Sequence, residues 1–187
     1  MAKSMQQSGM VWVAALAAAG LAGCPSYGPE PETVDFVDVE QYAGLWHEIA
    51  SNPVFFNKDL VAVTAEYEII GPGRISVLNM GREGSPEGPV QRISGVAQVV
   101  DEQTNSKLSV RFGTGLFSRL FAGEYWIVLL DEESYEYAVV TDSRQFTLFV
   151  LYREPEMPGV LFDQILDELA AKKIDTNRLE ITGAVMD

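Results

Sequence analysis

The stretch Tyr42–Ala50, YAGLWHEIA, places a glycine two residues before a tryptophan and follows the tryptophan with the only histidine of the chain. Gly44 has the backbone freedom to bend a chain tightly, while the indole of Trp46 is a large ring to bury. A tight bend beside a bulky ring suits a point where the chain enters a folded unit. The residues that follow show which unit this is.

Apolar and polar residues alternate along a series of short segments after this stretch. In residues 61–69, VAVTAEYEI, one face carries glutamates and the other is apolar, the apolar face being Val63, Ala65, Tyr67 and Ile69. A period of two is typical of a half-buried strand. With a first strand near 44–50, the same reasoning predicts further strands over residues 61–69, 74–80, 92–100, 106–112, 124–131, 135–142 and 146–153.

One helix is expected after the strands. Pro158 stands where a first helical turn would begin. The residues after it recur at helical spacing, namely Leu161, Ile165, Leu166 and Leu169. Lys172 and Lys173 are expected in the last turn, where positive charge suits the helix dipole. A short tail strand is expected over residues 178–182, RLEIT.

Strands in series with hairpin-length connections predict an all-β fold, an eight-stranded up-and-down antiparallel barrel with the C-terminal helix packed on it. The chain resembles the lipocalin family at three places: Gly44-x-Trp46 at the start of the first strand, Thr141-Asp142 before the last strand, and Arg153 at its end. The resemblance covers about residues 34–181 and is to the bacterial subgroup of outer-membrane lipoproteins, related to apolipoprotein D.

The resemblance implies structural roles for Gly44, Trp46, Thr141, Asp142 and Arg153. The indole is expected to plug the closed end of the barrel, with the guanidinium of Arg153 stacked on its face. Such a cation–π pair contributes about 0.5–2 kcal/mol. Gly44 would allow the bend by which the chain enters the barrel.

The resemblance also implies a ligand cavity inside the barrel. Alternation points Tyr67, Val110 and Phe112 inward, and the resemblance adds Tyr125 and Phe149 as lining residues. We therefore expect these five residues to bind ligand. The alternative for the aromatic residues is packing on the outside of the barrel.

An apolar cavity poor in carboxylates suits an acyl chain, since each buried CH₂ contributes about 0.8 kcal/mol. The expected ligand is a fatty acid or a lysophospholipid whose head stays at the open rim. Arg82 and Arg119, in two loops, are candidate partners for that head.

The N-terminus has the pattern of an export signal. Lys3 supplies positive charge, and the apolar run over residues 10–23 is shorter than the about 20 residues that span a bilayer. The signal ends at Leu21-Ala22-Gly23-Cys24, which resembles the bacterial lipobox, so Cys24, the only cysteine, is expected to be acylated. Pro25, rather than aspartate, follows it, and this favours the outer membrane.

We therefore expect a lipoprotein signal peptide over residues 1–23, a lipidated cysteine and an extended linker over residues 24–33, and a lipocalin domain over residues 34–187. The anchor would hold the domain at the outer membrane, on its periplasmic face. Removing Lys3 leaves 12 of the 13 basic residues against 27 acidic ones, a balance of 12 − 27 = −15. So acidic a protein is not expected to bind nucleic acid.

No residue pattern indicates catalysis, a metal or a cofactor. His47 is the only histidine, and residues 131–133, DEE, lie at a turn without the spacing of a calcium loop. His47 is expected on the outer surface, with a pH-sensitive role as the alternative. Alternation places no acid–base group inside the barrel, so the protein is expected to bind lipid without being an enzyme. A lipocalin-fold enzyme for an apolar substrate and an envelope lipoprotein with a filled barrel are the alternatives.

Overall fold

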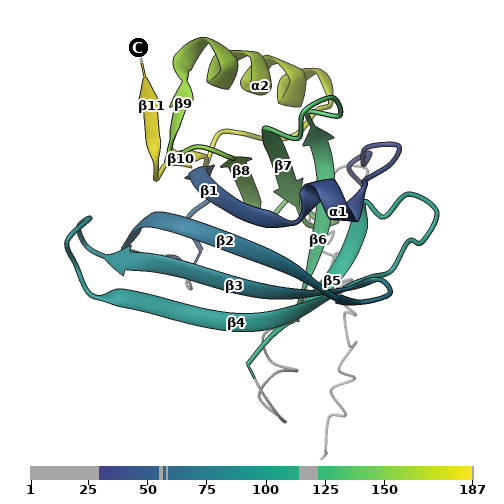
Figure 1. Cartoon of the computed structure of the whole chain (residues 1–187). Coiled ribbons are helices and arrows are strands. Elements are labelled where there is room, and N and C mark those ends of the chain that lie inside the picture. The colour runs from purple at the N-terminus through teal and green to yellow at the C-terminus, as the bar shows by residue number, and fades with distance from the viewer. Residues whose placement is uncertain (1–29, 55–56, 58, 114–121, 187) are drawn as a thin grey trace, which may run out of the picture.

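Eight antiparallel strands close into a barrel in the computed structural model, which describes residues 30–54, 57, 59–113 and 122–186 (Figure 1). The strands are β1 Gly44–Ser51, β2 Leu60–Gly71, β3 Arg74–Glu83, β4 Val90–Val99, β5 Lys107–Phe112, β6 Ala122–Leu130, β7 Tyr137–Thr141 and β8 Leu148–Tyr152. Each strand pairs with the next along the chain, and β1 also pairs with β8. The prediction of an eight-stranded up-and-down barrel is confirmed.

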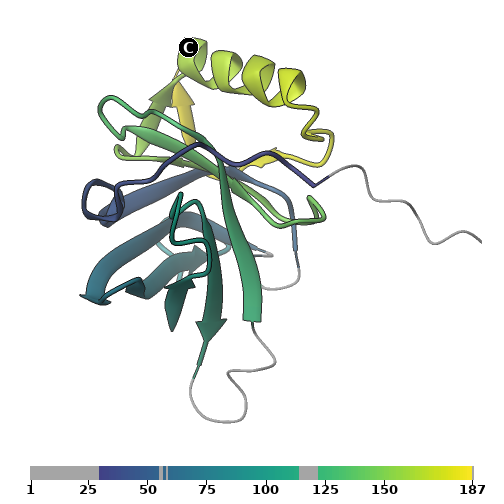
Figure 2. The same cartoon turned by 90° about the vertical axis from the view of Figure 1, so that its right-hand side faces the viewer.

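The up-and-down order gives the barrel two different ends. The β2–β3, β4–β5 and β6–β7 connections lie at one end, and the other four connections lie at the opposite end. Residues 34–42 run across the first end, with Val34 N–H bonded to the Ile127 carbonyl at 3.0 Å and Val37 N–H to the Thr104 carbonyl at 2.7 Å (Figure 2). This segment makes the first end the closed one.

The crossing segment finishes in the short helix α1, Val39–Tyr42. The Asp38 carboxylate caps α1 by accepting from the N–H groups of Glu40 and Gln41. The hydrogen bond from the Gln41 side-chain amide lowers the pKa of Asp38 most, and the N–H groups of Gln41 and Glu40 lower it further. The cap orients α1 so that Tyr42 is buried at the closed end.

The C-terminal helix α2, Gly159–Ala171, lies against the outside of the barrel (Figure 1). Pro158, expected at the start of the first turn, is the N-cap instead, one residue before the helix begins. Lys172 is the C-cap, and Lys173 follows it with φ 60°, so both lysines lie just past the last turn rather than within it. Neither of the two described helices is long and apolar enough to cross a membrane.

Three short strands flank α2. The tail strand β10, Glu180–Ile181, pairs with Ala50 and Ser51 of β1. The pairing of β1 with β2 ends at His47, and β10 takes the place of β2 along the rest of that edge of β1. The strands β9, Glu156–Pro158, and β11, Ala184–Met186, form a separate parallel pair. Sequence alternation did not predict this pair, because three-residue strands are too short to show a period.

Buried apolar residues form two clusters on the two faces of the barrel wall. One cluster lies inside the barrel and includes Trp46, Tyr67 and Val110. The other joins the outer face of β1 and β6–β8 to α2, through residues such as Val150 and Leu169. Both faces of β6 and β8 are therefore apolar, which is why alternation along β6 does not reveal its inner face.

Candidate functional site

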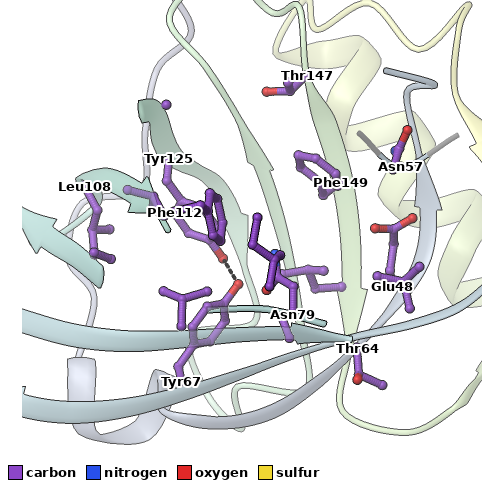
Figure 3. A pocket seen from close by; sticks show the side chains of 18 of the residues that line it. Glu48, Asn57, Thr64, Tyr67, Asn79, Leu108, Phe112, Tyr125, Thr147 and Phe149 are labelled. Atoms are coloured by element: carbon purple, nitrogen blue, oxygen red, sulfur yellow. Dashed lines mark hydrogen bonds between the residues drawn. The ribbon is translucent and has the colours of Figure 1, made fainter. Parts of the chain in front are cut away.

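The barrel encloses a cavity of about 1090 Å³ (Figure 3). All five residues expected to bind ligand lie on its wall: Tyr67 from β2, Val110 and Phe112 from β5, Tyr125 from β6, and Phe149 from β8. Ligand sites in proteins usually have about 300–1,000 Å³. The space is thus large enough for an acyl chain, and side chains do not fill the barrel.

Alternation along β2 and β5 gives the inner face except at Thr64, which shares the side of Glu66 in the alternation yet lines the cavity next to a register shift. Leu108 and Val110 are buried and line the cavity, as do Ala65 and Tyr67. Ile69 does not line the cavity and its side chain is 42% exposed. It pairs with Ile75, which does line the cavity, so the two lie on the same face of the sheet, and Ile69 lies nearer the closed end of β2.

Three tyrosines form a hydrogen-bonded cluster deep in the cavity. The Tyr125 hydroxyl lies 3.0 Å from that of Tyr67 (Figure 3) and 2.7 Å from that of Tyr42. Burial raises the pKa of Tyr67 to about 12 and the pKa values of Tyr42 and Tyr125 well above 10. All three are therefore neutral at physiological pH. Two bonds among three hydroxyls use two of their protons, so one O–H remains to donate to a ligand.

The closed end is built around Trp46 and Arg153. Trp46 has no exposed surface, and its Nε1 donates to the Tyr42 carbonyl at 2.8 Å. The Arg153 guanidinium lies 3.8 Å from the centre of the indole ring. Gly44 takes φ 100°, and a Cβ at this position would lie 3.4 Å from Arg153 Nη1. The backbone angle favours glycine here, while the distance to the guanidinium is an ordinary van der Waals contact.

The predicted pair Thr141-Asp142 lies at the β7–β8 turn. The Asp142 carboxylate accepts from the Arg144 N–H at 2.8 Å, the Thr147 N–H at 2.6 Å and the Thr147 hydroxyl at 2.7 Å. The Thr141 hydroxyl donates to the Thr147 carbonyl. Together these bonds fix the turn, and the hydrogen bonds to Asp142 lower its pKa although burial opposes them.

One buried carboxyl group lies in the cavity wall, contrary to the expectation that no acid–base group points inward. Glu48, in the middle of β1, is 6% exposed and lines the cavity (Figure 3). Its Oε1 accepts from the Thr182 hydroxyl at 2.8 Å. Burial raises the pKa of Glu48, and the hydroxyls of Ser51 and Thr182 oppose that shift. The signal was present in the sequence: if Trp46 plugs the barrel, then Glu48, two residues on, faces inward too.

A second polar group of the wall was also missed. Asn79, in β3, lines the cavity, and its Oδ1 is buried without a hydrogen-bond partner among the described residues. Asn79 pairs with Ala65, which in turn pairs with Trp46, so the three side chains share the inner face of the sheet. The Asn79 side chain lies in the middle part of the cavity (Figure 3).

The open rim differs from expectation in its arginines. Arg82 does not line the cavity, and its Nη1 donates to the Gly88 carbonyl at 3.2 Å in the β3–β4 loop. Arg119 lies outside the described residues. Arg92 and Arg144 lie on the wall instead. Among the described lining residues, five are acidic and two are basic.

His47 lies on the opposite face of β1 from Glu48 and is half-buried. Burial lowers the pKa of His47, and the Glu154 carboxylate partly offsets this. The described residues hold no group of three or more His, Cys, Asp or Glu side chains arranged to bind a metal ion.

Comparison with known proteins places this cavity in a family. The model of the lipocalin-like domain family matches residues 37–184. The chain belongs to the lipocalin family. Lipocalin membership implies binding of a small hydrophobic ligand. It also agrees with the positions of Gly44, Trp46 and Arg153 at the closed end.

Similar curated lipocalins come from bacteria and animals. The chain is 33% identical to the outer membrane lipoprotein Blc of Vibrio cholerae, over 85% of this chain and 90% of that protein. It is 32% identical to Blc of Escherichia coli K12, over 84% of both chains. It is 31% identical to mouse apolipoprotein D, over 82% of this chain and 80% of that protein. The resemblance to bacterial lipocalins of the Blc type is thus confirmed.

Solved structures share the lipocalin fold at lower identity. Insecticyanin of the tobacco hornworm Manduca sexta superposes with a TM-score of 0.66 at 20% identity, over 85% of this chain and 87% of that chain. Lobster apocrustacyanin A1 superposes with a TM-score of 0.59 at 16% identity, over 88% of this chain and 94% of that chain.

Proposed function

We propose that this lipocalin binds the acyl chain of a fatty acid, a lysophospholipid or a similar amphiphile in its barrel, at the outer membrane. The observation that carries this proposal is the cavity of about 1090 Å³. Its wall is apolar along β2 and β5, so a chain entering it leaves water at about 0.8 kcal/mol for each CH₂. Tyr67, Val110, Phe112, Tyr125 and Phe149 are the proposed contacts.

Binding without catalysis is the form of this function that the site favours. The described carboxyl group in the middle of the cavity, Glu48, is bonded to the Thr182 hydroxyl, and His47 lies on the other face of β1. The cavity of about 1090 Å³ is not expected for a purely structural lipoprotein whose barrel is filled with side chains. A lipid incubated with the protein and recovered from it should have an unchanged mass.

Binding can be measured with the mature chain, residues 24–187, carrying Cys24→Ser so that no acyl anchor enters the cavity. Lipid extracted from this protein should be identified by mass spectrometry. Fatty acids and lysophospholipids should also displace the neutral fluorophore N-phenyl-1-naphthylamine. Failure of every lipid to co-purify and to displace the fluorophore would refute the proposal.

Two variants test the wall. Phe149→Ala and Tyr125→Ala should each weaken laurate binding about tenfold, since about 1.4 kcal/mol is the burial of roughly two CH₂ groups. Phe36→Ala is the matched control, because Phe36 is 54% exposed and does not line the cavity. Tyr125→Ala should also lower stability, since its hydroxyl bonds to two tyrosines. Wild-type affinity in both wall variants would show that the ligand lies elsewhere.

The location rests on the lipobox and on the relatives named outer membrane lipoproteins. We propose that Cys24 is acylated and anchors the protein on the periplasmic face; Cys24 lies outside the described residues. In a Gram-negative host, labelled palmitate should enter the wild-type chain and not Cys24→Ala. A Cys24→Ala protein that still takes up label and sediments with outer membranes would exclude this anchor.

A further inference from the structure

We propose that the ligand places an uncharged, hydroxyl-bearing group at the level of Glu48 and Asn79, so that the cavity prefers a monoacylglycerol-like amphiphile to a fatty acid anion. This inference rests on the proposed function and names its ligand class. It starts from two polar side chains in a wall that is otherwise suited to an acyl chain.

Glu48 and Asn79 lie at the same depth, between the tyrosine cluster and the rim. β1 and β3 both run from the closed end to the open end, and each residue is in the middle of its strand. Glu48 pairs with Leu151 of β8, which also lines the cavity. The two side chains thus form one polar level in the wall (Figure 3).

At this level Asn79 offers a buried acceptor that a wholly apolar ligand would leave without a donor, whereas Glu48 already accepts from the protein. The Asn79 Oδ1 is buried and has no partner among the described residues. Glu48 is bonded through Oε1 to Thr182 and is 6% exposed. A chain that displaces water from this level removes the remaining source of donors, and a buried acceptor without a donor is costly. A ligand hydroxyl at this level supplies the donor.

The charges of the wall exclude an anion at the same level. Five acidic side chains line the described cavity against two basic ones. A ligand carboxylate beside Glu48 would meet an acidic group and bring no proton to donate. An ammonium group could also donate to Asn79, but burying its charge costs more than burying an uncharged hydroxyl.

Four C12 ligands with the same chain separate these possibilities: 1-monolaurin, laurate, methyl laurate and dodecylamine. They are titrated at pH 7 against N-phenyl-1-naphthylamine bound to the mature Cys24→Ser chain. Monolaurin should bind about tenfold tighter than laurate or methyl laurate, since tenfold corresponds to about 1.4 kcal/mol, the scale of one unmade hydrogen bond.

Two variants assign the effect to its residues. Asn79→Leu breaks no protein hydrogen bond of Oδ1, so it should fold normally, weaken monolaurin about tenfold and strengthen methyl laurate. Glu48→Gln can still accept from Thr182, so it should leave monolaurin nearly unchanged and strengthen laurate. Glu66→Gln, on the outer face of β2, is the control and should change none of the four affinities.

The outcomes are distinguishable. If no ligand displaces the fluorophore, the proposed function fails and the inference fails with it. If all four bind with similar affinity, or if Asn79→Leu leaves their order unchanged, the cavity binds lipid but this inference is wrong. If dodecylamine binds tightest and loses that advantage in Glu48→Gln, the level recognises an ammonium group, and the proposed hydroxyl ligand is refuted.

Discussion

Replacing Arg153 by alanine should destabilise the closed end more than any single surface change. The guanidinium stacks on Trp46 and donates four hydrogen bonds to main-chain carbonyl groups. These carbonyls belong to Tyr135 at 3.1 Å, Leu45 at 3.0 Å, Gln41 at 2.6 Å and Tyr42 at 3.3 Å. One side chain thus joins the β6–β7 turn, α1 and the start of β1.

The expected loss follows from these contacts. The bonds to Tyr135 and Tyr42 are part-buried and contribute about 0.5–1.5 kcal/mol each, while water can replace the donors of the two exposed bonds. The cation–π contact adds about 0.5–2 kcal/mol. Arg153→Ala should therefore cost about 3 kcal/mol in the free energy of unfolding. In a domain of this size that lowers the Tm by about 6–12 °C.

Urea unfolding followed by circular dichroism measures this cost. Arg153→Lys keeps a cation near the indole ring but loses the guanidinium's several N–H donors, so it should be about 1 kcal/mol more stable than Arg153→Ala. A double-mutant cycle of Arg153→Ala with Trp46→Phe should give a coupling energy of about 0.5–1 kcal/mol. Arg111→Ala, an exposed change on β5, should stay within about 0.5 kcal/mol of wild type. Equal stability of the Arg153→Ala and Arg111→Ala proteins would refute this account of the closed end.

Two further changes probe β1. Burial raises the pKa of Glu48 above its ordinary 4.5, so on acidification the folded protein takes up this proton before the unfolded chain does. The stability of wild type relative to Glu48→Gln should therefore rise as the pH falls from 7 toward 4.5 and stay constant below 4.5. Measurements of the Tm of both proteins from pH 4 to 8 test this. A constant difference across that range would mean that Glu48 is not desolvated. Gly44→Ala should cost about 1–2 kcal/mol in urea unfolding, because alanine is strained at φ 100°; a wild-type midpoint would contradict this.

The barrel was predictable because its strands are half-buried in the way that alternation detects. On β2 the outer face carries Glu66 and Glu68, so Tyr67 is assigned inward without a structure. The register shifts were not predictable. One lies between Ile69 and Gly71, and another between Glu48 and Ala50. After such a shift, residues change faces although the letters of the sequence still alternate.

The polar level of the cavity was missed for a different reason. Placing His47 on the outer surface already implies that its neighbour Glu48 faces inward, but a glutamate in a strand is usually solvated, and this implication was not followed. Asn79 was missed for the same reason, since asparagine is also mostly exposed in folded proteins. The contact that satisfies the buried carboxyl group of Glu48 comes from far along the chain, from the Thr182 hydroxyl, and no local pattern reveals it.

The position of the second cluster explains how a barrel can keep its interior empty. A cavity of about 1090 Å³ means that many inner side chains lack the dense contacts of an ordinary core. The outer cluster supplies them: Val128, Val139 and Val150 on the barrel wall, and Ile165 and Leu169 on α2, each have no exposed surface. Because α2 packs against the outer face of the wall, the inner face remains available to a ligand. The strands β6 and β8 are apolar on both faces because one face contacts the cavity and the other contacts α2.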